Sequence, residues 1–346
     1  MRLAVFSTKP YDKRYIEAAQ AARAHDGLEL VFHEASLTHD TASLAQDADA
    51  VCVFVNDSLG RDVIERLAGY GVRAILLRCA GYNNVHLETA QRHGIAVANV
   101  PSYSPEAVAE FAVALIQTLN RNTHRAYNRV REGNFALDGL LGHTLHGRTV
   151  GIVGTGRIGL ATARIMRGFG CRVLASDPFP SPELEGVGTY TSLDALLPEC
   201  DIVSLHCPLT DSTRHIINED TIGRMKRGVM LVNTSRGGLI DTKAVIKALK
   251  TGQLGGLALD VYEGESALFY DDHSGHIIHD DVLMRLTTFH NVLVCGHQAF
   301  FTAEALTEIA DCTLRNAEEL ADTGTCQNML TEVVLKDGGA LPVRNV

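Results

Sequence analysis

The stretch that decides the fold is Gly151-Ile152-Val153-Gly154-Thr155-Gly156-Arg157-Ile158-Gly159. A short apolar run of strand type, residues 149–153, leads into it, and apolar residues recur at helical spacing over residues 160–169 behind it. A second strand-like run, residues 172–176, ends directly before Asp177. Strand, glycine turn, helix and strand therefore follow one another, which predicts a βαβ unit.

The three glycines of this turn have distinct expected tasks. Gly154 permits the tight turn, Gly156 lets the backbone approach a pyrophosphate, and Gly159 lets the helix pack close to the strand. The N-terminus of the helix then offers N–H groups and a partial positive charge to phosphates. Asp177 stands where a carboxylate would accept hydrogen bonds from the ribose of NAD and would repel the additional phosphate of NADP. The pattern therefore predicts bound NAD rather than a purely structural glycine turn.

The turn and the end of the next strand are assigned to cofactor contacts. The residues are Gly154, Thr155, Gly156, Arg157, Ile158, Gly159, Asp177 and Pro178. Arg157 and Arg172 are interpreted as surface residues, since neither stands at the strand end where a 2′-phosphate would be held. NADP is therefore the less favoured cofactor.

Length and charge limit the classes of protein to consider. At 346 residues the chain is longer than one hydrophobic core usually supports, so two domains are expected. The net charge of −10 argues against nucleic acid as a partner, because nucleic-acid binding needs a basic face. No apolar run approaches the roughly 20 residues of a membrane span, and the N-terminus enters a strand pattern without a signal-peptide cleavage site. We therefore expect a cytoplasmic protein with no nucleic-acid or membrane partner.

Cysteine and histidine usage indicates the same class. The 8 cysteines are scattered, none forms a C-x-x-C pair, and most lie within apolar runs. This fits reduced thiols in a cytoplasmic enzyme. His273, His276 and His279 recur at three-residue spacing, but the polar residues around them indicate a solvated loop rather than a metal site. We predict no metal.

Two series of strand-like runs alternate with helical patterns, which predicts an α/β fold of parallel sheets with helices on both faces. The first series is Leu3–Phe6, Leu28–Phe32, Ala50–Val55, Ala74–Leu77 and Ile95–Asn99. The second series is Thr149–Val153, Arg172–Ser176, Ile202–His206, Val229–Asn233, Leu257–Asp260 and Val292–Cys295. These six runs suffice for a complete doubly wound dinucleotide fold.

A long helix is expected between the two series. Ser104 suits its N-cap and Pro105 its first position, and its apolar stripe either lies in the core of one subunit or forms a spine or subunit interface. The helical tail, residues 303–320, is expected to return to the first domain and to leave a substrate cleft between the domains. We place a discontinuous flavodoxin-like substrate domain at residues 1–102 and 299–346. The Rossmann NAD-binding domain is placed at residues 103–298.

Dinucleotide binding alone does not define a reaction. Hydride transfer to a keto acid also requires a cation for the carboxylate, a proton donor for the carbonyl oxygen, and a partner for that donor. The last three strands of the second series deliver such groups to the edge where open α/β sheets bind ligands. Arg236 follows the first of these strands and can hold a carboxylate by two parallel hydrogen bonds, and His297 follows the last. Glu263 and Glu265 follow the middle strand, and periodicity alone does not choose which of them partners His297.

Here the chain resembles, essentially from end to end, the D-specific 2-hydroxyacid dehydrogenases. The segment His206-Cys207-Pro208-Leu209-Thr210, with Thr213 and His215, is similar to the family's H-x-P-L-T-x-x-T-x-H element beside the cofactor. Met225-Lys226, Gly228 and residues 231–241 are similar to its arginine signature. The stretch from Asp260 to Glu265 and the pair Gly296-His297 are similar to its glutamate and histidine signatures.

The resemblance implies a role for each matched residue. By motif position, His297 is the acid/base, Glu265 rather than Glu263 is its partner, and Arg236 is the clamp on the carboxylate and carbonyl. Further residues are implied to contact the cofactor: His206, Cys207, Pro208, Thr213, Thr234, Ser235, Arg236 and Asp260.

The first domain and two aromatic residues are expected to form the substrate pocket. Ala80 and Gly81 are small residues that would offer backbone N–H groups to a carboxylate, as this loop does in the resembling family. Arg78 either adds charge or forms a structural salt bridge. Tyr103 and Phe300 resemble the lactate dehydrogenase branch, in which two aromatics crowd the substrate side chain, although both could also be core residues. The resemblance therefore implies reduction of pyruvate to D-lactate, with Arg236 and His297 in contact with the substrate.

Other interpretations remain open at this point. The same chemistry could act on a bulkier acid such as phenylpyruvate or a branched-chain keto acid. A different class is a non-catalytic NAD-sensing binding protein, since corepressors of the C-terminal binding protein type also resemble this family. Formate dehydrogenases are relatives too, but would show a serine after the Gln-His pair, whereas Gln298 follows His297 here. We expect a homodimer or a homotetramer.

Overall fold

The computed structural model describes residues 1–23, 27–333 and 335. The chain divides into two compact units, the first comprising Met1–Ser104 and Phe301–Val346 and the second Pro105–Phe300. These divisions fall two residues after those expected from the sequence. The C-terminal end of the expected substrate domain, residues 336–346, lies outside the described residues.

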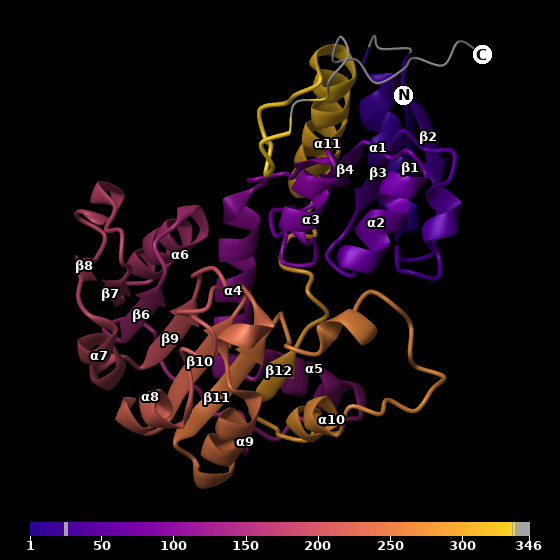
Figure 1. The fold of residues 1–346 in the computed structure, drawn as a ribbon. Coiled ribbons are helices and arrows are strands. Elements are labelled where there is room, and N and C mark those ends of the chain that lie inside the picture. The colour runs from indigo at the N-terminus through magenta and orange to yellow at the C-terminus, as the bar shows by residue number, and fades with distance from the viewer. Residues whose placement is uncertain (24–26, 334, 336–346) are drawn as a thin grey trace. The chain divides into compact units, whose positions relative to one another are not determined.

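The first unit is built on a five-stranded parallel sheet with the order β2-β1-β3-β4-β5 (Figure 1). Its strands are β1 (Arg2–Val5), β2 (Glu29–Phe32), β3 (Ala50–Val53), β4 (Ala74–Leu77) and β5 (Ala96–Ala98). The last three are buried along their whole length, which explains their continuous apolar sequence. This strand order is that of flavodoxin-like folds.

Helices from both ends of the chain cover this sheet. They are α1 (Pro10–Ala21), α2 (Arg61–Gly69), α3 (Leu87–Arg92) and α11 (Ala303–Thr323), with a 3₁₀ turn η1 (Ala42–Ala45). The tail helix α11 packs against α1, and its residues Ala310, Leu314 and Ala317 belong to the same apolar core as Leu3 and Val5. Beyond α11, the N–H of Leu330 donates to the carbonyl of Val97 on β5 at 2.7 Å. The segment from α11 to Leu330 is therefore an integral part of the first unit.

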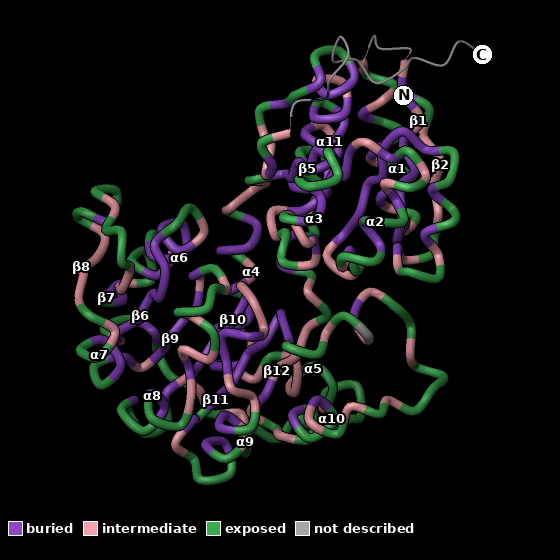
Figure 2. Tube along the Cα trace, in the orientation of Figure 1, coloured by how far each residue is buried: buried purple, intermediate pink, exposed green. Residues whose placement is uncertain are grey.

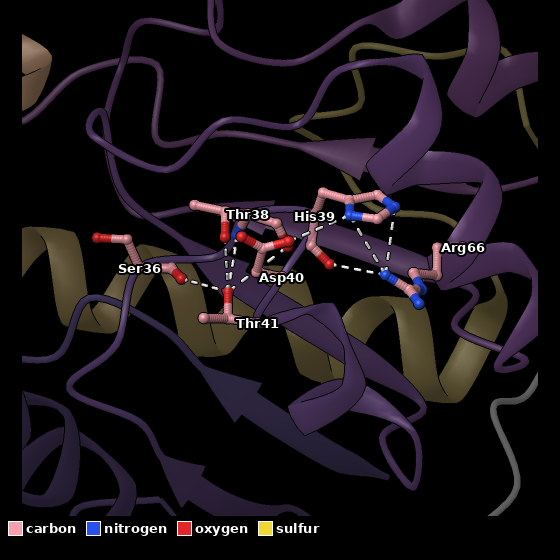
Figure 3. A network of polar contacts seen from close by, with 6 residues as sticks. All are labelled: Ser36, Thr38, His39, Asp40, Thr41 and Arg66. Carbon is pink, nitrogen blue, oxygen red and sulfur yellow. Dashed lines mark hydrogen bonds and ion pairs between the residues drawn. The ribbon is translucent and has the colours of Figure 1, made fainter.

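Polar contacts hold the connection between β2 and η1 (Figure 3). The hydroxyl of Thr41 donates to the carbonyl of Ser36 at 2.5 Å and accepts from the N–H of Thr38 at 2.9 Å. Arg66 on α2 donates to the carbonyl of His39 at 2.9 Å. This loop is therefore closed by its own side chains and tied to a neighbouring helix.

The second unit is built on a seven-stranded parallel sheet with the order β12-β11-β10-β9-β6-β7-β8. Its strands are β6 (Thr149–Val153), β7 (Arg172–Ser176), β8 (Thr189–Tyr190), β9 (Ile202–Leu205), β10 (Val229–Asn233), β11 (Leu254–Leu259) and β12 (Val292–Val294). The expectation of six strands was wrong, because β8 was missed. Two residues at a sheet edge are too few to show a periodic pattern.

Helices of the second unit complete the doubly wound arrangement. They are α4 (Pro105–Arg121), α5 (Thr123–Arg131), α6 (Arg157–Gly168), α7 (Leu193–Leu196), α8 (Glu219–Arg224), α9 (Thr242–Thr251) and α10 (Asp281–Thr287), with 3₁₀ turns η2 (Pro182–Leu184), η3 (Leu197–Glu199), η4 (Gly237–Leu239) and η5 (Glu265–Ala267). Helix α9 shows how sequence sets such bounds, since the Asp241 carboxylate accepts from two N–H groups of its first turn and Gly252, at φ +70°, ends it.

The core of the second unit lies on both faces of its sheet. On one face, Val113, Ile116 and Leu119 of α4 pack with Val150 and Ile152 of β6, so part of the α4 stripe is core of its own unit. Figure 2 shows β6 and β10 mostly buried, and β9 is buried throughout. The predicted α/β class with two parallel sheets is confirmed. Among the described residues, no helix is long and apolar enough to span a membrane.

Candidate active site

The glycine turn after β6 is shaped by close contacts. Gly154 has φ +94°, and a Cβ there would lie 2.5 Å from the nitrogen of Cys207. At Gly159 a Cβ would lie 2.0 Å from the carbonyl oxygen of Gly154. At Gly156 a Cβ would meet nothing within 4 Å. Two of the glycines are therefore needed for packing inside the chain, whereas Gly156 keeps open the space in front of α6.

Asp177, at the end of β7, is bound to this turn. Its Oδ2 accepts a hydrogen bond from the N–H of Thr155 at 2.6 Å, and its Oδ1 accepts from the N–H of Phe179 at 2.8 Å. Pro178 and Arg157 are exposed, and Ile158 is half-buried in the first turn of α6. Arg172 is also exposed and pairs with Glu199. Asp177 thus lies beside the glycine turn, while the two arginines are surface residues.

The end of β9 approaches the same turn with two enclosed polar atoms nearby. The Nδ1 of His206 and the Oγ1 of Thr234 are buried and have no hydrogen-bond partner among the described residues. Burial lowers the pKa of His206 to about 4, because it penalises the charged imidazolium. Cys207 is buried and accepts at its carbonyl from the Ser235 hydroxyl at 2.7 Å.

An exposed loop follows these residues. Pro208 is exposed, and its carbonyl accepts from the Thr213 hydroxyl at 2.6 Å. The same hydroxyl accepts from the N–H of Thr210 at 2.8 Å. Thr213 therefore holds the shape of this loop from within.

Arg236 lies just beyond the carboxyl end of β10. It is partly buried, and its Nη1 donates to the carbonyl of Ser235 at 2.7 Å. Among the described residues it has no ion-pair partner. Its charge is therefore available to a ligand.

The backbone around Arg236 is fixed by a residue that sequence reasoning missed. Asn233 is wholly buried, donates from its side chain to the carbonyl of Arg236 at 2.8 Å and accepts from the N–H of Ser235 at 3.0 Å. At Gly237 a Cβ would lie 2.1 Å from the carbonyl carbon of Tyr262, so only glycine fits there. An asparagine at a strand end before small residues is a turn signal that could have identified Asn233.

His297 follows β12 and contacts Glu265. Its Nδ1 lies 2.8 Å from Oε1 of Glu265, and the two side chains are only 15% and 20% exposed. The other carboxylate oxygen of Glu265 accepts from the N–H of Tyr262 at 2.8 Å. The imidazole is thus held at Nδ1, which leaves Nε2 as the nitrogen that can meet a ligand.

Glu263 has different partners from Glu265. Its carboxylate lies 3.0 Å from Nη1 of Arg214 and 3.2 Å from Nε2 of His215. All three side chains are more than a third exposed. Periodicity left the choice between the two glutamates open, and geometry agrees with the one that the resemblance implied, since Glu265 and not Glu263 lies against His297.

Asp260 organises the backbone on which His297 stands. It is wholly buried, and its two carboxylate oxygens accept from the N–H groups of Gln298 and Ala299 at 2.8 and 2.9 Å. Burial raises the pKa of Asp260, and these two N–H groups oppose that shift. The N–H of His297 donates to the carbonyl of Asp260 at 2.7 Å, and His297 has φ +53°, a conformation that is uncommon outside glycine. Asp260 thus supports a strained backbone; its contact with the cofactor stays a prediction.

The predicted substrate loop of the first unit follows β4. Arg78 is wholly buried, with its Nε 3.3 Å from Oδ1 of Asp12, so it forms the structural ion pair that was one of its two expected roles. The next residues, Ala80 and Gly81, are partly exposed, and their N–H groups have no acceptor among the described residues. Asn99 donates to the carbonyl of Ala80 at 2.8 Å, which fixes the loop from behind.

The two aromatic residues expected in the substrate pocket belong to different units. Tyr103 is partly exposed and precedes the end of the first unit, and Phe300 is buried at the end of the second. Within the described part of the chain, no group of three or more His, Cys, Asp or Glu residues is arranged to hold a metal ion. Of the three spaced histidines, His276 and His279 are exposed and His273 is half-buried.

Comparison with known proteins gives the family. Residues 113–299 match the "D-isomer specific 2-hydroxyacid dehydrogenase, NAD binding domain". The chain belongs to this family. It is 66% identical over 333 residues to "D-lactate dehydrogenase kk1H" of Curvularia clavata, with 96% of each chain covered. It is 65% identical over 331 residues to "2-hydroxyacid dehydrogenase A" of Aspergillus oryzae, with 95% of each covered.

A solved structure of the family has the same fold over nearly the whole chain. The apo-structure of D-lactate dehydrogenase from Escherichia coli superposes with a TM-score of 0.86 at 50% identity, covering 96% of this chain and 100% of the other. The protein is therefore an NAD-binding D-2-hydroxyacid dehydrogenase. Family membership supports an enzyme over the NAD-sensing binding protein considered from the sequence.

Residues of the second unit fit NAD on structural grounds. The N-cap of α6 is Gly156, so no N-cap side chain occupies the N–H groups of the first turn. The space in front of them is left for a pyrophosphate. The unpartnered Oγ1 of Thr234 and Nδ1 of His206 are polar atoms that a bound ligand could satisfy. The Asp177 carboxylate has no ion-pair partner among the described residues, and so disfavours a cofactor with an additional phosphate.

Proposed function

We propose that the enzyme reduces pyruvate to D-lactate with NADH and also catalyses the reverse reaction. One observation carries this proposal. His297 and Glu265 form a pair, with Nδ1 and Oε1 2.8 Å apart, and Arg236, whose charge has no ion-pair partner among the described residues, follows a strand of the same sheet. Strands β10, β11 and β12 are neighbours in the sheet, so the three side chains follow its adjacent carboxyl ends. The name D-lactate dehydrogenase carried by a relative at 66% identity supports pyruvate as the substrate.

In the proposed mechanism, each of three side chains has one task. Bound NADH supplies the hydride. Arg236 holds the substrate carboxylate by two parallel hydrogen bonds and fixes its plane. His297 donates the proton on Nε2 to the carbonyl oxygen as the carbonyl carbon is reduced. Glu265 accepts the hydrogen bond from Nδ1–H, which keeps the imidazole oriented with Nε2 toward the substrate.

The first unit is assigned to substrate binding. In this proposal the N–H groups of Ala80 and Gly81 bind the substrate carboxylate, since these two groups have no acceptor in the described part of the chain. Tyr103 and Phe300 crowd the substrate side chain, which favours the methyl group of pyruvate over a larger substituent. The cofactor contacts assigned from the sequence belong to the same proposal.

We also propose that the enzyme works as a homodimer or homotetramer in a reducing compartment such as the cytoplasm. Helix α5 buries no side chain, and the segment that begins there exposes large apolar residues: Tyr127, Val130, Phe135, Leu137 and Leu141. Exposed apolar residues gathered in this way are typical of protein interfaces. All 8 cysteines are free thiols, which supports the compartment.

A substrate comparison tests the proposed reaction. The oxidation of NADH is followed at saturating cofactor with pyruvate, phenylpyruvate and 2-ketoisocaproate, and the products are separated on a chiral column. We expect the highest kcat/KM for pyruvate and D-lactate as its product. A preference for either bulky acid would keep the mechanism and reject the roles of Tyr103 and Phe300. Formation of L-lactate would reject the proposed stereochemistry.

A matched pair of glutamate variants tests the mechanism. In Glu265→Gln the imidazole loses its charged partner, so kcat should fall by about a hundredfold, in the range expected for acid–base assistance. Glu263→Gln removes a carboxylate two residues away whose partners are exposed, so kcat should change less than twofold. Steady-state kinetics with pyruvate measure both. Equal losses in the two variants would contradict the assignment of Glu265.

A further inference from the structure

Tyr190 lies on the edge strand β8 and has no role in the reaction described above. In the parallel pairing of β7 with β8, Tyr190 is opposite Ala175, two residues before Asp177. The N–H of Thr191 donates to the carbonyl of Ala175 at 2.8 Å, which fixes this register. The strand therefore holds the Tyr190 side chain next to the carboxyl end of β7, where the ribose-binding carboxylate stands.

The hydroxyl of Tyr190 links two segments that are distant in sequence. It donates to Oγ1 of Thr155 at 2.8 Å, and it accepts from the N–H of Ser181 at 2.8 Å. Thr155 belongs to the glycine turn before α6, and Ser181 follows Asp177 by four residues. One phenol thus joins the turn that faces the pyrophosphate to the loop that begins at the ribose carboxylate.

The Asp177 carboxylate is held by the same two segments. Its two oxygens accept from the N–H groups of Thr155 and Phe179, one on each side. Thr155 is therefore bound through its N–H to Asp177 and through its hydroxyl to Tyr190, and is itself only 4% exposed. Movement of Thr155 would carry one of the two donors away from the carboxylate.

We propose that Tyr190 is a positioning residue that sets the preference of the enzyme for NADH over NADPH. It acts by holding Thr155 and Ser181 so that the Asp177 carboxylate keeps one orientation toward the ribose. A fixed carboxylate accepts from the ribose hydroxyls at low entropic cost and opposes a 2′-phosphate with its full charge. A carboxylate that can turn away binds the ribose hydroxyls more weakly and repels a 2′-phosphate less. The inference rests on the NAD cofactor of the family and is independent of the substrate proposed above.

The aromatic ring of Tyr190 has a separate structural task. It is partly buried and packs against the apolar core that includes Val173 and Leu184. Tyr190→Phe keeps this ring and removes only the hydroxyl, so the edge strand remains packed. The variant therefore isolates the two hydrogen bonds from the packing of β8.

The test measures cofactor binding in the absence of substrate. Dissociation constants of NADH and NADPH are determined by isothermal titration calorimetry for the natural protein and for Tyr190→Phe. We expect the constant for NADH to rise about threefold to tenfold, the range set by one or two hydrogen bonds, while the constant for NADPH stays within twofold or falls. Tyr15→Phe is the matched control, because its hydroxyl also accepts a hydrogen bond, from Arg14 at 3.2 Å, on α1 of the first unit. It should leave both constants unchanged.

A second background shows whether Tyr190 acts through Asp177. In an Asp177→Asn protein, the further change Tyr190→Phe should no longer alter the ratio of the two constants, because the charge that discriminates is already absent. Thermal unfolding midpoints confirm that all variants are folded. Equal weakening of NADH and NADPH by Tyr190→Phe, or no weakening at all, would overturn the proposal. Persistence of the ratio change in the Asp177→Asn background would overturn it as well.

Discussion

Arg78 and Arg236 were both considered as positive charges for the substrate, with a structural salt bridge as the alternative for Arg78, and the two have opposite environments. Both follow buried parallel strands, β4 and β10 respectively. Arg78 is 1% exposed, its Nε lies 3.3 Å from the Asp12 carboxylate, and its guanidinium stacks over the Phe54 ring at 4.9 Å. Arg236 is partly exposed and donates from Nη1 to a backbone carbonyl one residue away.

The difference separates a charge that holds the fold from a charge that can bind a ligand. A buried ion pair is costly to break, because either member alone would be an uncompensated charge away from water. Nearby acidic groups raise the pKa of Arg78 despite its burial, so the guanidinium stays charged inside the first unit. Arg236 has no such partner in the described residues, and its charge becomes compensated only when an anion binds.

The largest effect is expected from Arg236→Gln. Loss of a charged, bidentate contact to the substrate carboxylate should cost about 4 kcal/mol in kcat/KM, or roughly a thousandfold. The free energy of unfolding should change by less than about 0.5 kcal/mol, since no ion pair is broken. Kinetics with pyruvate and urea unfolding measure the two quantities. A large loss of stability with little loss of kcat/KM would reverse the comparison.

A smaller effect, on stability and not on kcat/KM, is expected from Arg78→Met. Removal of the guanidinium leaves Asp12 nearly buried without its partner, which should lower the free energy of unfolding by about 3 kcal/mol. The double change with Asp12→Asn should recover part of this loss, because the Asp12 charge is then no longer left without its partner. Urea unfolding of the two variants decides the matter. A stable Arg78→Met protein with a raised KM for pyruvate would show that Arg78 serves the substrate after all.

The smallest effect is expected in the pH dependence of stability, through the buried imidazole of His206. Burial lowers the pKa of His206 to about 4 from an ordinary 6.5. Below about pH 6.5 the unfolded chain binds a proton at this residue, while the folded chain does so only near pH 4. The free energy of unfolding should therefore fall as the pH decreases from about 6.5 to 4, with His206 contributing about 2 kcal/mol of this change.

His206→Gln should flatten that part of the stability curve, measured by urea unfolding between pH 4 and 7. The control is His39→Gln, which changes a histidine that is 56% exposed and should keep the natural slope. An unchanged slope in His206→Gln would mean that His206 is protonated alike in the folded and unfolded chains. Its enclosed Nδ1 would then need a different explanation.

Much of the fold could be predicted because it depends on neighbours along the chain. The bounds of β4, β6, β7 and β10 agree with the sequence expectation to the residue, since each is built around a short apolar run that turn or polar residues bound. Strand β8 could not be predicted, because its existence depends on pairing with β7 rather than on its own two residues. The end of β3 was placed two residues late, because the apolar Phe54 and Val55 continue the run into the following loop. The end of β9 was placed one residue late, at His206.

Sequence alone was enough to predict the glycine turn, the alternation of strands and helices that indicates parallel sheets, and the acid that follows β7. It also placed Arg, Glu and His residues after three successive strands. These are local patterns, and residue type and spacing are enough to indicate their chemistry. Motif position implied Glu265 rather than Glu263 as the partner of His297, and the tertiary structure showed that contact. Only the tertiary structure showed that Arg78 pairs with Asp12 and that Tyr190 joins Thr155 to Ser181. Those pairings form between residues far apart in the chain, where burial and distance, rather than sequence neighbours, set which charges remain free.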